Sequence, residues 1–103
     1  MSNSNKNDFQ SDLLDVVVAL SNREEAQTFL VDLCTPSEIK ALSERWRVCQ
    51  LLYNTDLSYR QIHQETGASL TTIGRVARFL RDENYGGYKK ILEKIYGDGN
   101  EQS

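Results

Sequence analysis

Residues 57–80 constrain this chain more than any other segment, because they predict two short helices joined by a tight glycine turn. Ser58 stands at an N-cap position and Gln61, three residues later, completes a capping box for the first helix. Gly67 tolerates the positive φ that commonly ends a helix, and Ser69 can cap the helix that follows. This pattern predicts a helix-turn-helix, a shape that fits the major groove of DNA.

The second helix of this pair, predicted over residues 70–81, has an apolar face and a basic face. Its apolar residues recur at helical spacing: Leu70, Ile73, Val76, Ala77 and Leu80. The opposite face carries Thr71, Thr72, Arg75, Arg78 and Arg81. An arginine stripe is often only a solvated surface, so this pattern alone does not separate DNA binding from a plain helical domain.

The distribution of charge favours DNA binding. Residues 1–38 carry two basic and seven acidic side chains, residues 39–81 carry seven and three, and residues 82–103 carry three and five. The net charge of −3 therefore hides a positive segment that coincides with the helix pair. Phosphate contacts require such a basic patch, while the overall acidity predicts modest non-specific affinity.

The length of 103 residues allows one domain, whose core a monomer could only just support. We expect the domain to span residues 8–97, with disordered polar tails at residues 1–7 and 98–103. No stretch approaches the roughly twenty apolar residues of a membrane span, and no signal peptide begins the chain. We therefore expect a cytoplasmic protein that does not bind a membrane.

Residues suited to catalysis or metal binding are few. Cys34 and Cys49 are too far apart for a redox pair and, with His63 as the single histidine, too few for a zinc site, so we expect two buried, inert thiols. The chain has no nucleophile and base at a catalytic spacing and no Gly-rich phosphate loop. The sequence predicts neither an enzyme, nor a metal site, nor a cofactor.

Three further helices are predicted upstream of the pair, and a last short one after Gly86-Gly87. The first, at about 8–20, is apolar over most of its surface, so we expect other helices to enclose it. Residues 21–24 predict a capping box for the second helix, and residues 35–38 a stronger one for the third, at 36–54. The six helices predict an all-α fold, and a homodimer would enclose the first helix and present two reading helices ~34 Å apart.

Four motifs lie between about Leu33 and Leu80, nearly half of the chain. Over this range the chain aligns without a gap to the core of one known family. The motifs are Thr35-Pro36-Ser37-Glu38, Arg45-Trp46-Arg47, Ser58-Tyr59-Arg60-Gln61-Ile62 and Gly67-Ala68-Ser69-Leu70-Thr71-Thr72-Ile73-Gly74-Arg75. In this order they resemble the core of the bacterial Trp repressor family, and most of all its Trp-repressor-like YerC/YecD group. The resemblance implies a six-helix fold, an intertwined homodimer, and a transcriptional repressor that binds double-stranded operator DNA.

The resemblance also implies a candidate effector site. In tryptophan-sensing members two arginines sandwich the indole, and the matching residues here are Arg45 and Arg75, with Thr35 and Thr72 as polar partners. A guanidinium can stack on an aromatic ring or grip a carboxylate. The alternative is that Arg45 pairs with a local carboxylate such as Glu44 or Asp56 and that Arg75 contacts phosphate.

Two substitutions predict that tryptophan is a poor effector. Val76 stands where the tryptophan-sensing members have glycine and would fill part of the indole space. Trp46 replaces a small aliphatic residue between the arginines of the third helix. Another small ligand, or no effector at all, remain open alternatives.

Helix geometry predicts which side chains approach DNA. The base-reading set comprises Leu70, Thr71, Gly74 and Arg78. The backbone-contacting set comprises Tyr59, Arg60, His63 and Arg75. Arg78 is the residue best suited to grip a guanine O6/N7 pair. The competing hypothesis is a small helical adaptor that binds another protein through Tyr85, Tyr88 and Tyr96 and does not bind DNA.

Overall fold

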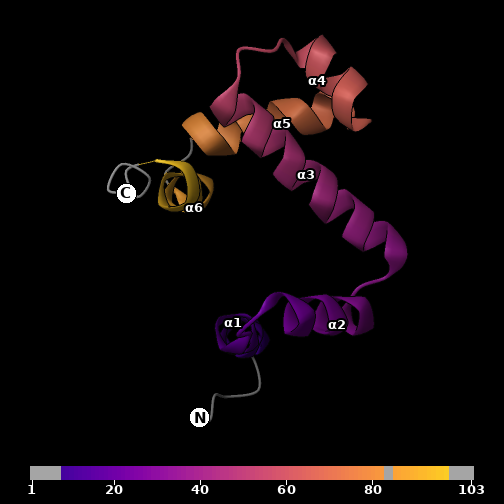
Figure 1. Cartoon of the computed structure of the whole chain (residues 1–103), viewed down its shortest axis with the longest axis vertical. Coiled ribbons are helices and arrows are strands. Elements are labelled where there is room, and N and C mark those ends of the chain that lie inside the picture. The colour runs from indigo at the N-terminus through magenta and orange to yellow at the C-terminus, as the bar shows by residue number, and fades with distance from the viewer. Residues whose placement is uncertain (1–7, 83–84, 98–103) are drawn as a thin grey trace. The chain divides into compact units, whose positions relative to one another are not determined.

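The computed structural model describes residues 8–82 and 85–97, which fold into six α-helices without a strand (Figure 1). The helices are α1 (Phe9–Ala19), α2 (Arg23–Leu33), α3 (Pro36–Asn54), α4 (Tyr59–Thr66), α5 (Leu70–Arg81) and α6 (Gly87–Tyr96). The predicted all-α class is confirmed, while the predicted tails at 1–7 and 98–103 lie outside the described residues. In the ranges described, no helix combines the length and apolarity needed to cross a membrane.

The chain divides into two compact units, residues 1–39 and residues 40–103. In the first unit, α2 begins one residue later than predicted. The cap is Asn22, whose side chain accepts a hydrogen bond from the Glu25 backbone N–H at 2.9 Å. The Ser21 N–H donates in return to the Glu25 carboxylate at 2.9 Å. The expected box at residues 21–24 is therefore wrong by one position, because Asn22 and Glu25 offer the same chemistry.

Helix α1 exposes its large apolar side chains in the single chain. Neither α1 nor α2 contributes a fully buried residue, and Phe9 and Val18 are 75% and 82% exposed. The other large apolar side chains of α1 that lie in water are Leu13, Leu14, Val16 and Val17. Within the described residues of the first unit, no neighbour encloses this helix as predicted.

The start of α3 agrees with the sequence analysis. Thr35 Oγ1 accepts from the Glu38 N–H at 3.1 Å, and the Thr35 N–H donates to Glu38 Oε1 at 2.8 Å. Pro36 fills the first helical position, where its missing N–H leaves no backbone hydrogen bond unmade. This reciprocal cap holds the first turn of the helix whose later turns carry the core of the second unit.

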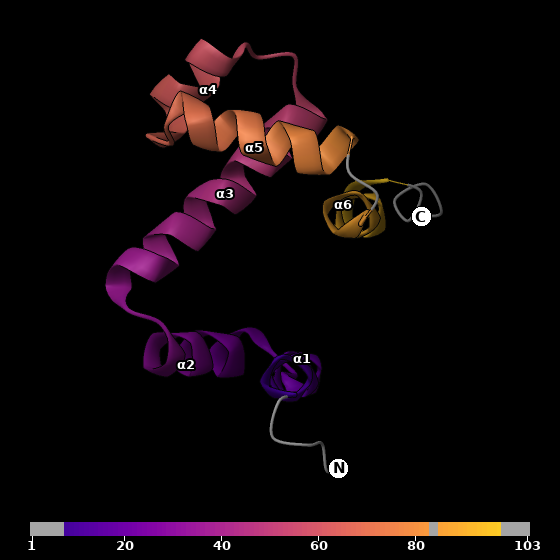
Figure 2. The same cartoon turned by 180° about the vertical axis from the view of Figure 1, so that it is seen from behind.

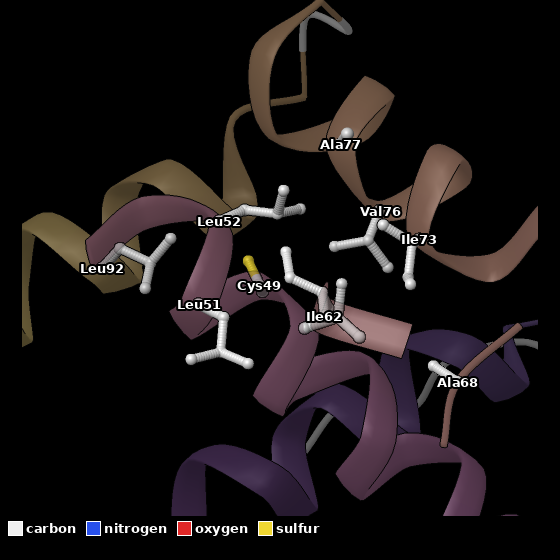
Figure 3. Packing of buried hydrophobic residues seen from close by; sticks show 10 residues of the cluster. Cys49, Leu51, Leu52, Ile62, Ala68, Ile73, Val76, Ala77 and Leu92 are labelled. Atoms are coloured by element: carbon white, nitrogen blue, oxygen red, sulfur yellow. The ribbon is translucent and has the colours of Figure 1, made fainter. Parts of the chain in front are cut away.

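The core of the second unit lies between the C-terminal half of α3 and the three helices that follow it. In both views α5 lies across α3 (Figures 1 and 2). The buried side chains converge from all four helices (Figure 3). They are Val48, Cys49, Leu51 and Leu52 of α3, Ile62 of α4, Ala68 of the turn, Ile73, Val76 and Ala77 of α5, and Leu92 of α6.

The two cysteines differ in their surroundings. Cys49 is fully buried in this core, as predicted, and burial raises the pKa of its thiol to about 11. Cys34 ends α2 and is only half-buried, so the prediction of two buried thiols holds for Cys49 alone. Because the thiolate is the reactive form, Cys49 is inert at neutral pH.

We predict that Ile73→Ala lowers the free energy of unfolding by about 2–5 kcal/mol, because the fully buried side chain leaves a cavity in the core. Leu70→Ala, on the same helix, is the matched control. Leu70 is 55% exposed, so its truncation should change stability by only about 0.5 kcal/mol. Urea denaturation followed by circular dichroism, at one fixed protein concentration, measures both; equal losses would contradict the position of the core.

Candidate nucleic-acid interface and adjoining cavity

The α4–α5 pair begins at the capping box that the sequence predicts. Ser58 Oγ accepts from the Gln61 N–H at 3.1 Å, and the Ser58 N–H donates to Gln61 Oε1 at 2.8 Å. These two bonds satisfy backbone donors that the first turn of a helix otherwise leaves free. Helix α4 then buries Ile62 completely. Tyr59 and Arg60, in the first turn of α4, are exposed.

Several polar groups of the turn between α4 and α5 are satisfied within the chain. Gly67 has a φ of 80°, and its N–H donates to the His63 carbonyl at 2.9 Å. The His63 ring donates from Nδ1 to the Ala68 carbonyl at 2.7 Å. Ser69 Oγ accepts from the Thr72 N–H at 3.0 Å, which caps α5. The turn is therefore a fixed connection that sets the position of α5 relative to α4.

The hydrogen bond from His63 Nδ1 to the Ala68 carbonyl changes the role expected for His63. The residue is exposed and was predicted to contact the DNA backbone. With Nδ1 donating to Ala68, only Nε2 is left for an outside partner. Its first role in the structure is to bridge the turn.

The outward face of α5 carries the predicted base-reading residues. Leu70, Thr71 and Arg78 are exposed, and Gly74 is half-buried. Leu70, Gly74 and Arg78 are spaced four residues apart, so they form one row along the helix. From Tyr59 to Arg81 the chain holds four arginines and one glutamate. The two helices therefore present a positive surface.

A cavity of about 630 Å³ lies beside α5. Its lining residues are Arg45, Arg75, Val76, Phe79, Tyr85, Gly87 and Tyr88. The volume falls within the range of small-molecule sites. Arg45 and Arg75, from α3 and α5, are the two arginines expected at an effector site, and the structure brings both to this cavity. Across the described ranges, no three His, Cys, Asp or Glu side chains gather as a metal site would require.

An aromatic stack occupies one side of the cavity. The Arg75 guanidinium lies over the Phe79 ring, 4.5 Å from its centroid, and that of Arg78 lies 5.3 Å away. Phe79 also stacks on Tyr85 with centroids 6.0 Å apart. This stack was not predicted from the sequence, although Phe79 follows Arg75 by four residues, the spacing that brings two side chains together on a helix. Arg75 thus already has an aromatic partner within the chain.

Other predicted effector residues have different places. Thr72 is absent from the cavity lining, and its hydroxyl lies 3.0 Å from that of Ser69 at the start of α5. Thr35 belongs to the first unit, where it caps α3. Trp46 packs against the core and does not line the cavity, so its predicted obstruction of the ligand space is not observed. Glu44 pairs with Lys40, so the alternative pairing of Arg45 with Glu44 is not formed.

The three tyrosines of the adaptor hypothesis do not form one outward surface. Tyr88 and Tyr96 pack against the core, and the Tyr96 hydroxyl accepts from Gln50 Nε2 at 2.7 Å. Tyr85 is 77% exposed and stacks on Phe79. Two of the three side chains therefore serve the fold of the second unit.

Comparisons with known proteins agree on one family. Residues 10–96 match the family model described as Trp repressor protein. The uncharacterized protein YerC of Bacillus subtilis is 39% identical over 85 residues, which cover 81% of this chain and 78% of YerC. A Trp operon repressor homolog of Aliivibrio salmonicida is 32% identical, covering 90% and 89%. The crystal structure of a TrpR like protein from Eubacterium eligens has a TM-score of 0.76 at 36% identity, covering 82% and 86%. The resemblance expected from the motifs is confirmed.

Proposed function

Because the chain belongs to the Trp repressor family, we propose that it is a transcriptional repressor that binds operator DNA as a homodimer and uses the α4–α5 pair as a helix-turn-helix. Proteins of this family are regulators and not enzymes. The observation that carries the proposal is the outward face of α5, where Leu70, Thr71 and Arg78 are exposed beside a turn that its own hydrogen bonds hold.

The proposed role of each residue follows from its position on α4 or α5. Residues at the start and on the outward side of α5 reach base edges when this helix enters the major groove, and Arg78 supplies two donors for guanine O6 and N7. Tyr59 and Arg60 stand in the first turn of α4 and contact phosphates, as does Arg75. His63 contributes through Nε2 alone, since Nδ1 holds the turn.

The test is selection of bound duplexes from a random pool by the purified full-length protein. We expect one sequence class to be enriched and its affinity to fall steeply between about 50 and 200 mM salt, because binding releases counterions from phosphates. Arg78→Ala should cost ~1–3 kcal/mol per half-site of the selected duplex and relax the preference at one base position in each half-site.

Arg60→Ala is the matched control for this experiment. It should weaken binding to all duplexes alike and lower the salt slope by about two, because the dimer loses one phosphate contact from each copy. Equal and sequence-independent losses for both variants would remove the distinction between a base reader and a backbone contact. Retention on no duplex, together with a protein partner held equally at low and high salt, would favour the adaptor.

The homodimer is proposed from the apolar surface of the first unit. Phe9, Leu14 and Val18 are more than half exposed on α1, and Leu33 of α2 is 52% exposed. Large apolar side chains exposed in this number on one helix are typical of an interaction site. A second copy of the chain is the proposed occupant, because two-fold symmetry also gives the paired reading helices that an operator requires.

Replacing Leu14 and Val18 together by Asp should shift the protein from dimer to monomer, because both carboxylates would lose water in the interface. The matched control is Gln10→Asp with Ser11→Asp, which adds the same charge near the start of the same helix, where acidic side chains are favourable. Sedimentation velocity distinguishes the two. A Leu14→Asp, Val18→Asp variant that sediments as a folded dimer would show that α1 is not the interface.

We further propose that tryptophan is not the effector of this protein. Val76 is 1% exposed and borders the cavity from the core, so an indole edge cannot enter there without displacing it. The Phe79 ring already covers the Arg75 guanidinium. Both observations support a regulator in which Val76 limits the space for an indole and one face of Arg75 already has an aromatic partner.

Calorimetric titration of L-tryptophan, with and without the selected duplex, should show no micromolar binding and no change in DNA affinity. An effector shifts DNA binding only by the difference between its affinities for the two states of the protein. Micromolar binding that tightens duplex affinity tenfold, a coupling of ~1.4 kcal/mol, would restore the tryptophan-sensing role. Val76→Gly is the informative variant, because tryptophan binding gained only there would identify the side chain that closes the site.

A further inference from the structure

Gly74 stands in the middle of α5 without a structural reason to be glycine. Its backbone is helical, and the glycines with positive φ in the described residues are Gly67 and Gly86. A Cβ atom built at Gly74 meets nothing within 4 Å. Neither backbone conformation nor packing therefore excludes a side chain at this position.

Glycine at such a position weakens the helix. Relative to alanine, an interior glycine loses more conformational freedom on folding, which corresponds to about a fivefold smaller folding equilibrium constant. The neighbours of Gly74 in its row, Leu70 and Arg78, are both exposed. The missing side chain therefore leaves a notch in the outward face of α5, between an apolar and a cationic side chain.

We propose that Gly74 is a specificity-determining residue, which lets the backbone of α5 approach the bases so that a thymine methyl group enters the notch beside Leu70. This inference rests on the proposed function, since it needs α5 in the major groove. Thymine is the base that presents a methyl group there, and apolar side chains recognise it by contact. The exposed Leu70 supplies the apolar wall, and a methyl at residue 74 would occupy the same space.

The experiment uses the full-length protein and the duplex that it selects. Each thymine of that duplex is replaced in turn by deoxyuridine, which removes the methyl group alone. For the wild-type protein we expect one position in each half-site at which this replacement weakens binding about fourfold, the value of one buried methyl-sized group. Gly74→Ala should bind the selected duplex at least tenfold more weakly and should no longer distinguish thymine from deoxyuridine at that position.

Stability provides a second readout that separates this role from damage to the fold. Gly74→Ala should raise the urea midpoint while it lowers DNA affinity, because alanine favours the helix. Ser43→Thr is the control, since it also adds one methyl group to an exposed helical position but lies outside the α4–α5 pair. It should bind the selected duplex as the wild type does.

The outcomes are distinguishable. If the wild-type protein selects a duplex and Gly74→Ala binds it with the same affinity and base preference, the inference is wrong. The proposed function then stays intact. A loss of affinity in Gly74→Ala without any thymine at which deoxyuridine matters would overturn the assignment of the methyl group. A wild-type protein that selects no duplex at any salt concentration would overturn both the proposed function and this inference.

Discussion

The packing of α3 against the α4–α5 pair is the interaction on which the rest of the second unit depends. Val48 and Cys49 of α3 are fully buried, as are Ile62 and Ile73 on the two helices that cover them. Figure 3 shows Cys49, Ile62 and Ile73 within one cluster of side chains. Helix α5 thus has one face in the core and the other in water. Because interiors are closely packed, the buried face fixes the rotation of α5 about its axis, and so determines which side chains point outward.

Much of the fold could be predicted because the helix boundaries are set by local chemistry. The reciprocal caps at Thr35 and Ser58 and the positive φ of Gly67 each involve residues within four positions of one another. Local chemistry also accounts for the cap of α2, which was predicted one residue too early. Ser21 and Asn22 are both good cap residues, and each is followed at the third position by a glutamate, so the sequence could not choose between them.

The cavity was harder to predict because tertiary contacts bring its lining residues together. The family motifs identified Arg45 and Arg75, yet they gave no sign that Phe79 and Tyr85 would stack between α5 and the start of α6. Trp46 was placed at the ligand space from its position between two arginines. In the structure that side chain packs against the core, since helical neighbours in sequence point to different sides.

Two features oppose an aromatic effector in the proposed regulator, and their magnitudes differ. Separating Arg75 from Phe79 costs a cation–π contact at an exposed site, about 0.5–1 kcal/mol, which weakens ligand affinity only two- to fivefold. Displacing Val76 disturbs a fully packed core, where overpacking costs typically 1–3 kcal/mol. The stack alone would therefore be a weak barrier, and the buried valine is the stronger one. A ligand that reached Arg45 and Arg75 without touching Val76 would meet only the smaller cost.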